Sequence, residues 1–467
     1  MFFSMMEDLQ TGHYSLPAYT TYNHAAIPFA YPPIALYMAG MIQSASSLSL
    51  ISLIQWAPTV INLAILPLFF VFARQLLNTE PKAALATLLF ALTPNSYWWQ
   101  IVGGGITRAP GALFFLLTAL SAERAYRKRT IAWITLTAIG GSLTVLSHPE
   151  WGLQAAVVIF LFSIFYGCDR RGFLISAVIF VSVSMITAPW WLAVGRTHGW
   201  ETFYQAAQVS NSRWLFWTIP FGLRFTGETL PVIATLGMFG LFIHFSRKEI
   251  LLPVWALLCL FADPRGGLPA SIIPFSLLAA TALSDGIATQ LLPEENHADR
   301  WIRSLSTGAG RAFWGFGILL LTYNAVQISS TLAAHSLSTA EQDALTWASA
   351  NTEPDDRFLI LTDEANPLLS PMTEWFPALT GRVSILTVQG SEWLTGKSSY
   401  SERVVILRQA QSCLFQDTDC LIEIGVEYEY LILKNGARYP LFYRLSESPR
   451  FKKVYDADSV QIFKKHP

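Results

Sequence analysis

The 467-residue chain is 52% hydrophobic and only 13% charged, whereas soluble globular proteins carry about 25% charged residues. This composition excludes an ordinary soluble enzyme, and the ordinary contents of Gly (29) and Pro (25) exclude a low-complexity disordered chain. A formal net charge of -1 gives no overall basic field, so we expect no nucleic-acid partner. Up to residue 335 there are roughly 18 Lys and Arg against 14 Asp and Glu, and after it roughly 13 against 18. A slightly basic apolar part therefore precedes an acidic part, and the two are expected to face different solvents.

Long charge-free runs predict the membrane helices, because crossing a bilayer takes about 20 apolar residues and a central charge costs about 2.5 to 3.5 kcal/mol. We expect about ten transmembrane helices, near residues 52–73, 84–102, 109–122, 131–147, 151–167, 173–194, 230–246, 250–262, 268–284 and 313–333. The predicted fold class is a polytopic α-helical membrane protein. The short spans, such as 250–262, would need support from neighbouring helices or local thinning of the bilayer.

The Lys and Arg residues of the connections predict the orientation, since cytoplasmic loops carry the excess of both. One set of connections holds Arg74, Lys82, Arg124, Arg127, Lys128, Arg129, Arg170, Arg171, Arg247, Lys248, Arg300, Arg303 and Arg311, and the opposite set holds Arg108, Arg196, Arg213, Arg224 and Arg265. The first side is predicted to be the cytoplasm. With an even number of spans, residues 1–50 and the region after 335 then share the extracytoplasmic side of a multi-pass protein, which we expect in a bacterial plasma membrane.

Three parts are predicted along the chain. Residues 1–50 form an extracytoplasmic N-terminal loop, in which the apolar stretch 34–43 is too short to span and is expected to lie along the interface as a helix. Residues 51–335 form the multi-spanning domain, and 336–467 a small soluble α/β domain. No signal sequence or membrane helix precedes residue 50 to carry the first part outward. We therefore expect an upstream helix to be missing from this version of the chain, although a short, sparsely charged tail can also translocate unaided.

The C-terminal part has a different pattern. Ser338 and Glu341 have the spacing of a capping box, which predicts a helix running to about Asn351. Strands are predicted at 357–362, 383–388, 430–433 and 460–463, with turns at 435–436 and 456–458. Cys413 and Cys420 lie close in sequence. Two alternatives are open: the two residues form a disulfide, or both are free thiols.

Four polar motifs fall on the predicted outer side of the membrane: residues 23–33, rich in Pro and aromatic residues, Gly103–Gly111, Ser147–Trp151 and Asp263–Gly267. The glycines and Arg108, just before a helix, suit an anion such as phosphate. The alternative is a tight turn with Arg108 at the lipid headgroups. Charges at the membrane edge, as in Asp263 and Arg265, indicate a functional site unless they satisfy each other or other loop charges.

The third motif places His148 and Glu150 two residues apart at the membrane surface, where they would bind phosphate, bind a metal weakly or move a proton. Equally, Glu150 would simply stabilise the N-terminus of the helix that follows.

Together these residues resemble a known family. Tyr31-Pro32-Pro33, followed by the apolar residues 34–36 and Tyr37, resembles the signature of the first outer loop of GT-C type glycosyltransferases, the multi-spanning enzymes related to the dolichyl-phosphate-mannose protein mannosyltransferases. The segments 103–108, 148–150, 263–265 and 374–382 resemble positions of bacterial members.

The resemblance implies a hexosyltransferase that moves a sugar from a polyprenyl-phosphate-linked donor in the bilayer to an extracytoplasmic glycan, lipid or protein acceptor. A divalent metal assists in some members of the family, and the metal ligands here are unknown. In that family a carboxylate in the first outer loop acts as base or positions the acceptor. The early acids of this chain are Glu7 and Asp8.

The resulting hypothesis has three sets of residues. Arg108, His148 and Arg265 hold the donor phosphate, because its release as a leaving group develops negative charge. Glu7, Asp8 or Glu150 deprotonates the acceptor, and Tyr31 and Asp263 support the site. Two other functions stay open. A transporter or flippase of lipid-linked sugars would show repeats and charged or broken helices near the midplane, and in a non-catalytic membrane anchor that displays a binding module the four motifs should scatter.

Overall fold

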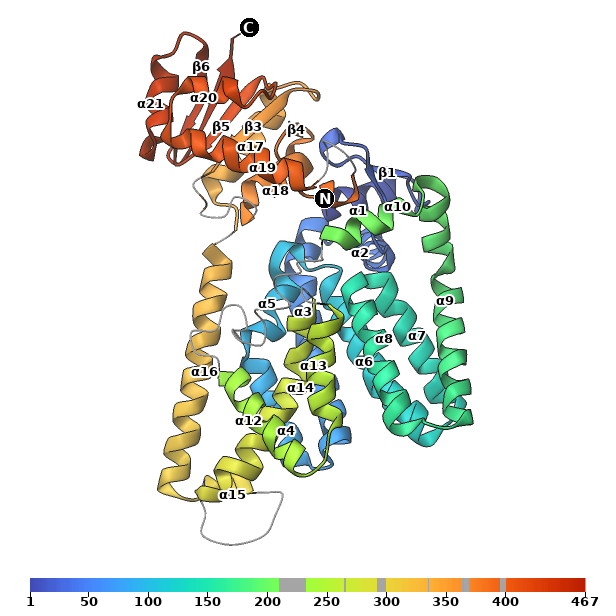
Figure 1. The fold of residues 1–467 in the computed structure, drawn as a ribbon. Helices are drawn as coiled ribbons and strands as arrows, with labels where there is room; N and C mark the ends of the chain where they lie inside the picture. The colour runs from blue at the N-terminus through green and yellow to red at the C-terminus, as the bar shows by residue number, and fades with distance from the viewer. Residues whose placement is uncertain are drawn as a thin grey trace. The chain divides into compact units, whose positions relative to one another are not determined.

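The computed structural model of the chain describes residues 1–209, 232–263, 266–291, 300–334, 336–362, 364, 369–394 and 400–466. The chain divides into two compact units (Figure 1). One contains residues 31–193 and 210–332, and is called the helical unit here. The other contains residues 1–30, 194–209 and 333–467, and is called the sheet unit. The predicted domain limits at 50/51 and 335/336 stay a prediction.

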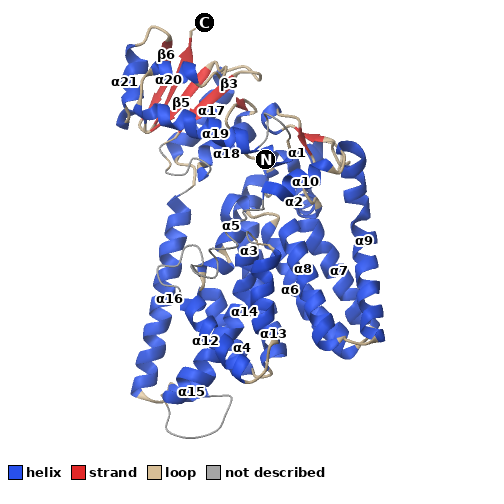
Figure 2. Cartoon of the chain, viewed as in Figure 1, coloured by secondary structure: helices blue, strands red, loops and turns tan. Residues whose placement is uncertain are grey.

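The helical unit is built almost wholly of helices, drawn in blue in Figure 2. They are α2 (Ile34–Ala45), α3 (Leu50–Leu77), α4 (Glu80–Leu92), α5 (Trp98–Ile101), α6 (Arg108–Lys128), α7 (Ile131–Ser147), α8 (Pro149–Tyr166), α9 (Arg170–His198), α12 (Val232–Ser246), α13 (Leu251–Ala262), α14 (Gly267–Thr281), α15 (Arg300–Ser304) and α16 (Gly308–Ala334). Helix α9 continues into the sheet unit.

Every predicted span coincides with a helix, but the span predicted at 84–102 is wrong in its extent. Helix α4 ends at Leu92, and Pro94 then begins a short 3-10 turn before α5. Proline lacks the N–H that would continue the helix, and the residue before it is driven out of the helical region. The residues that interrupt this span are proline and uncharged polar residues. A prediction based on runs without charged residues therefore cannot detect the interruption.

Within the described residues, five helices are long and apolar enough to cross a membrane: Leu50–Leu77, Pro149–Tyr166, Arg170–His198, Gly267–Gln290 and Gly308–Ala333. Shorter apolar helices are Ile34–Ala45, Ile131–Ser147, Val232–Ser246 and Leu251–Ala262. The helix expected at 34–43 is thus present as α2. The count of ten membrane crossings and their direction stay predictions.

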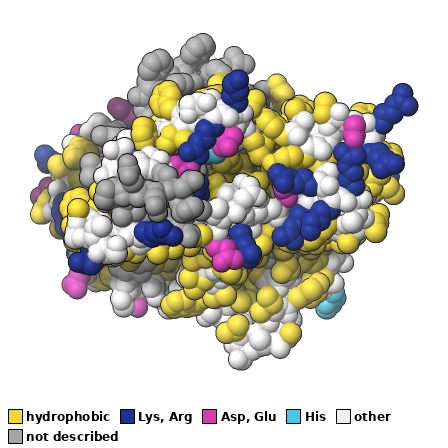
Figure 3. All heavy atoms as spheres, turned by 90° about the horizontal axis from the view of Figure 1, so that it is seen from below, with side chains coloured by type: hydrophobic (Ala, Val, Ile, Leu, Met, Phe, Trp, Pro, Cys, Tyr) yellow, Lys and Arg dark blue, Asp and Glu magenta, His cyan; other side chains and the backbone are white. Residues whose placement is uncertain are grey.

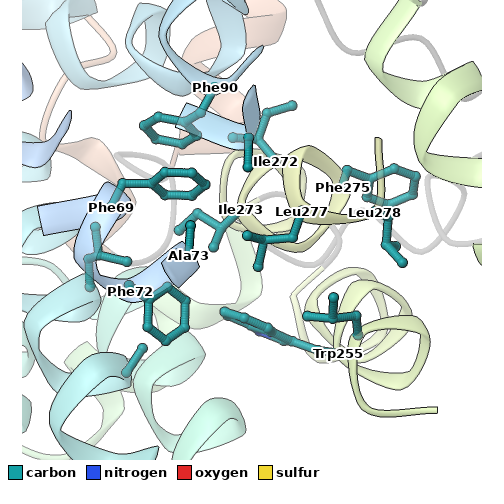
Figure 4. Close-up of a cluster of buried hydrophobic side chains, with 14 of the residues drawn as sticks. Phe69, Phe72, Ala73, Phe90, Trp255, Ile272, Ile273, Phe275, Leu277 and Leu278 are labelled. Atoms are coloured by element: carbon teal, nitrogen blue, oxygen red, sulfur yellow. The ribbon is translucent and has the colours of Figure 1, made fainter. Parts of the chain in front are cut away.

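The core of the helical unit surrounds α14, whose residues from Ala270 to Thr281 are all buried. Phe69 and Phe90 stack with ring centroids 4.3 Å apart, and Phe72 meets the edge of Trp255 at 5.7 Å (Figure 4). These side chains come from α3, α4 and α13 and pack around one central apolar helix. Such a helix, hydrophobic on every side, is stable only when other helices enclose it.

Helices α12 and α14 approach closely because glycines remove side chains between them. A Cβ built on Gly240 would lie 2.0 Å from the Leu278 carbonyl oxygen, and one on Gly237 would lie 2.3 Å from a ring carbon of Phe275. Small residues are the usual means by which membrane helices bring their backbones together.

We expect Gly240→Ala to destabilise the protein by about 1 to 3 kcal/mol, because the added methyl group must push α12 away from the α14 backbone. The measurement is heat-induced loss of the monodisperse protein in detergent. Gly317→Ala is the matched control, since a Cβ at Gly317 of α16 meets nothing within 4 Å. Equal midpoints for the two variants would contradict this packing.

The sheet unit contains α1 (Phe2–Thr11), β1 (Tyr19–Thr20), β2 (Ile27–Pro28), α10 (Glu201–Val209), α17 (Thr339–Asn351), β3 (Arg357–Leu361), α18 (Pro371–Thr380), β4 (Val383–Ser384), α19 (Tyr400–Ser412), α20 (Thr418–Glu423), β5 (Tyr430–Lys434), α21 (Pro440–Glu447), β6 (Phe451–Ala457) and β7 (Val460–Lys465). The predicted capping box of Ser338 and Glu341 is present at α17. The expected α/β fold of this part is therefore confirmed.

Five strands form one mixed sheet in the order β4-β3-β5-β7-β6. Strands β4, β3 and β5 are parallel, whereas β7 runs antiparallel to β5 and β6. Alternate residues of β3 enter two separate cores, with Phe358 in one and Leu359 in the other. This follows from the twofold period of a strand, and it explains why the central strands read as continuous apolar runs.

Two details of the predicted sheet are wrong. The strand expected over 383–388 has only the two residues of β4, and β6 was not expected at all. The turn predicted at 435–436 is present: Asn435 adopts a left-handed conformation, φ 52°, and begins the 3-10 turn Gly436–Arg438. The turn predicted at 456–458 does join the antiparallel strands β6 and β7. Cys413 and Cys420 form a disulfide, so the open alternative of two free thiols is excluded.

The first 30 residues pack against the C-terminal domain within the sheet unit. Asn23 Nδ2 donates to the Ser384 carbonyl oxygen at 2.9 Å, and the Ser384 N–H donates to Asn23 Oδ1 at 2.7 Å. Tyr22 Oη donates to the Glu374 carbonyl oxygen at 2.7 Å. The reciprocal pair occupies the backbone of β4, an edge strand that would otherwise offer open hydrogen-bonding groups. This packing supports the prediction that both segments share one side of the membrane.

Candidate functional site

Two predicted site residues lie where α8 begins. His148 precedes the helix with an extended backbone, and Pro149 takes the first helical position, where a missing N–H breaks no hydrogen bond. Glu150 follows in the first turn. The His148 side chain is buried and Glu150 is half-buried. The sequence thus places a ring nitrogen and a carboxylate together at the positive end of a helix.

The glycine-rich segment brings Arg108 to the start of α6. A Cβ at Gly105 would lie 1.6 Å from the Gln100 carbonyl oxygen, so the chain doubles back there with no room for a side chain. The Arg108 guanidinium carbon lies 4.1 Å from the centroid of the Trp99 ring, and its NH2 group donates to the Val102 carbonyl oxygen. Arg108 is only 8% exposed. Arg108 is therefore a buried cation held by the chain's own groups, which argues against the alternative of a side chain in the lipid headgroups.

Tyr31 connects the first polar motif to the second and third. Its hydroxyl lies 3.3 Å from Thr107 Oγ1, and its ring centroid lies 6.2 Å from that of His148. His148 also packs against α6, since a Cβ on Gly111 would lie 2.9 Å from the His148 Cβ. The sequence did not predict that Thr107 contacts Tyr31 or that Trp99 contacts Arg108. Thr107 could have been found from its place beside Arg108 in the glycine-rich motif.

Glu150 meets the fourth motif at Gly266. A Cβ on Gly266 would lie 2.4 Å from Asp263 Oδ2 and 3.0 Å from Glu150 Oε2, so both carboxylates reach the same small volume. Asp263 ends α13 and is 6% exposed. Gln154, one turn further along α8, donates to the Cys259 carbonyl oxygen at 3.0 Å and fixes α8 against α13. An acid from the first turn of α8 and an acid at the end of α13 are thereby held near each other.

The polar cluster is defined as Tyr31, Thr107, His148, Glu150 and Asp263, joined by these contacts and by the chain, together with Arg108, which follows Thr107 at the start of α6. It brings together four motifs that are far apart in sequence. Three helices, α6, α8 and α14, begin within it, at Arg108, Pro149 and Gly267. Helix N-termini carry partial positive charge and unpaired N–H groups, so the cluster suits an anion beside its carboxylates. In a non-catalytic membrane anchor the four motifs should scatter, whereas in the helical unit they lie near one another.

Buried polar atoms next to the cluster lack partners among the described residues. They include Asn95 Nδ2, Gln100 Oε1 and Ser147 Oγ. A buried polar group without a hydrogen bond costs about 1 to 3 kcal/mol, and such groups gather where water or a ligand supplies the partner. Asn95 and Gln100 lie in the interruption after α4.

The remaining predicted residues lie elsewhere. Glu7 and Asp8 are on α1 of the sheet unit, and Asp8 accepts hydrogen bonds from the Thr21 N–H at 3.1 Å and the Thr21 hydroxyl at 2.7 Å. Desolvation and the neighbouring Asp8 charge raise the pKa of Glu7. Arg265 lies outside the described residues. The structure thus brings together Tyr31, Arg108, His148, Glu150 and Asp263, and gives Asp8 a structural contact.

Among the described residues, no group of three or more His, Cys, Asp or Glu side chains lies close enough together to hold a metal ion. Glu150 and Asp263 are two such side chains that reach one volume.

No protein-family model matches the sequence, and no curated protein matches it. Among solved structures, the chain matches ArnT from Cupriavidus metallidurans, crystallised in the apo state, with a TM-score of 0.55 over 99% of this chain and 92% of that one. The chain has the fold of a GT-C glycosyltransferase. The identity is only 12%, so this likeness establishes the fold alone. The reaction has to be inferred from the residues of the site. The resemblance seen in the sequence is thereby confirmed at the level of the fold, including the helical membrane part and the C-terminal sheet domain.

Proposed function

We propose that this protein is a glycosyltransferase that moves a sugar from a polyprenyl-phosphate-linked donor to an acceptor on the extracytoplasmic side of the plasma membrane. The observation that carries the proposal is the polar cluster, in which a buried arginine, a histidine and two acids lie at or next to the starts of three helices. A lipid-linked donor suits a site in a unit made of apolar helices. The neighbour ArnT is a 4-amino-4-deoxy-L-arabinose transferase, which supports sugar transfer without naming this chain's sugar.

The proposed reaction breaks the bond between the anomeric carbon of the sugar and the donor phosphate oxygen. That oxygen leaves with the electron pair of the bond as polyprenyl phosphate. The anomeric carbon forms a new bond to an acceptor oxygen, whose proton passes to a carboxylate. Charge develops mainly on the leaving phosphate, so fixed donors aimed at it lower the barrier.

Each cluster residue has a role in this reaction. Arg108, held over Trp99, binds the phosphate through its planar guanidinium, and His148 donates a second hydrogen bond from the start of α8. Arg265 supplies a further cation to the phosphate. Glu150 accepts the acceptor proton, and Asp263 orients Glu150 from across Gly266. Tyr31 holds Thr107 and His148 in register.

The test is turnover of a polyprenyl-phosphate-linked sugar by the purified protein, followed as release of polyprenyl phosphate. Arg108→Ala, His148→Ala and Arg265→Ala are expected to lower turnover, whereas Arg196→Ala should not. Arg196 is an exposed arginine of α9 on the same predicted side, so it controls for loss of surface charge. Intact turnover in all three site variants would overturn the phosphate assignment. Movement of donor across vesicles without release of polyprenyl phosphate would support a flippase instead.

A further inference from the structure

A second charged site lies at the other ends of α3 and α6, away from the polar cluster. Basic side chains gather there among exposed apolar ones on the face drawn in Figure 3. Lys82 and Arg129 form ion pairs: Lys82 Nζ lies 2.8 Å from Asp285 Oδ1, and Arg129 Nη1 lies 2.8 Å from Asp169 Oδ2. These cations belong to the set predicted to face the cytoplasm.

Between the two helix ends is a cavity of about 360 Å³. It is lined by Phe70, Val71, Arg74, Gln75, Glu123, Arg124, Arg127 and Lys128. Four cations and one carboxylate line this space, and Arg74 is also paired with Glu80 at 3.0 Å. A cleft lined by one sign of charge with apolar walls concentrates its field on an ion of the opposite sign.

The arginines of this cavity are held in place before any ligand binds. Arg124 Nε donates to Gln75 Oε1 at 2.6 Å, and its guanidinium lies 4.6 Å from the centroid of the Trp133 ring. Arg127 Nε lies 2.7 Å from the buried Glu123 Oε1, and its guanidinium lies 4.4 Å from the Tyr166 ring. Both arginines are thus anchored through Nε and an aromatic face. Preorganised guanidinium groups favour phosphate, whose oxygens match their fork of donors.

The walls of the cavity match a lipid more closely than a soluble anion. Phe70 and Val71 come from α3, one of the helices long and apolar enough to cross a membrane. Val71 is 43% exposed and would face the acyl chains. Basic pockets between membrane helices on the cytoplasmic side are a recurrent binding site for anionic lipid headgroups.

We infer that the cavity between the ends of α3 and α6 binds the phosphate headgroup of an anionic phospholipid, with Arg124 and Arg127 as its main donors. This site is separate from the proposed donor site, because it lies at the C-terminal end of α6 while Arg108 lies at the N-terminal end. Its ligand is a lipid of the surrounding bilayer, and it does not undergo the proposed reaction.

The test uses the full chain in a neutral detergent, titrated with dioleoylphosphatidylglycerol, dioleoylphosphatidylcholine or inorganic phosphate, with lipid adducts counted by native mass spectrometry. The wild type should bind the anionic lipid about tenfold more tightly than the zwitterionic one. The double variant Arg124→Gln/Arg127→Gln should lose that preference. The control Arg170→Gln/Arg171→Gln should keep it, because these exposed arginines at the start of α9 are not part of the cavity lining.

A second variant keeps the test valid if the glutamines disturb folding. Arg124→Lys/Arg127→Lys retains both positive charges but not the planar guanidinium groups. We therefore expect a preference for the anionic lipid between that of the wild type and that of the glutamine variant. Three results would overturn the inference: equal binding of the two lipids by the wild type, equal loss in the control pair, or a lysine pair that binds as well as the wild type. Binding of inorganic phosphate alone that is as tight as binding of the anionic lipid would overturn the choice of a lipid.

Discussion

Glu150→Gln is expected to lower kcat for sugar transfer by about 10²- to 10⁴-fold, because the amide keeps the shape of the side chain but cannot take a proton. The KM for the donor should change little, since the phosphate contacts come from Arg108 and His148. Steady-state kinetics with a saturating acceptor measures both parameters. Glu150 is chosen for this role because its carboxylate reaches the same volume as that of Asp263, beside Gly266 and at the start of α8.

The controls for Glu150 separate a base from a nearby charge. Glu201→Gln removes an exposed carboxylate on α10 and should leave kcat unchanged. Asp8→Asn should mainly weaken the contact with Thr21 and lower stability. Asp263→Asn should lower kcat less than Glu150→Gln does. A fully active Glu150→Gln enzyme alongside an inactive Asp263→Asn or Glu7→Gln enzyme would give the base role to another acid.

Arg108→Lys should lower kcat by about 10²- to 10³-fold, the usual cost of losing one fixed donor to a developing anion. Lysine keeps the positive charge but loses the flat group that stacks on Trp99 and reaches the Val102 carbonyl oxygen. The readout is kcat together with the affinity for polyprenyl phosphate, the product.

The lysine variant also tests the simpler role of Arg108 as a headgroup anchor. An anchor needs only charge at the membrane surface, so lysine would serve equally well. Wild-type turnover in Arg108→Lys would therefore contradict the phosphate role. Arg196→Lys is the matched control, because it makes the same change on an exposed arginine of α9.

The sequence predicted the helices well because charge is so costly inside a bilayer that its absence marks each apolar helix. It failed at residues 93–102, where the helix predicted over 84–102 is interrupted after Leu92 by uncharged residues that include Pro94 and Asn95. It also missed β6, since Lys452, Lys453 and Asp456 make that strand look like a loop. Strand β6 is at the edge of the sheet, where outward charges are normal.

The candidate site was predictable in its residue types but not in its pairings. Arg108, His148 and Asp263 could be singled out because polar residues at membrane edges need a reason. That Glu150 meets Asp263, and that Tyr31 meets His148, depends on how α6, α8 and α13 pack, which no local pattern contains. The burial of Arg108 against Trp99 could not be predicted either, because Trp99 lies within the span predicted at 84–102.

The most direct test of the central claim is an experimental structure of the full chain with polyprenyl phosphate bound. The account predicts that the phosphate lies at the starts of α6 and α8, within hydrogen-bond distance, about 3 Å, of the Arg108 guanidinium and beside the His148 ring. Glu150 should face the side from which an acceptor would approach. A phosphate bound away from Arg108 and His148 would contradict the proposed site.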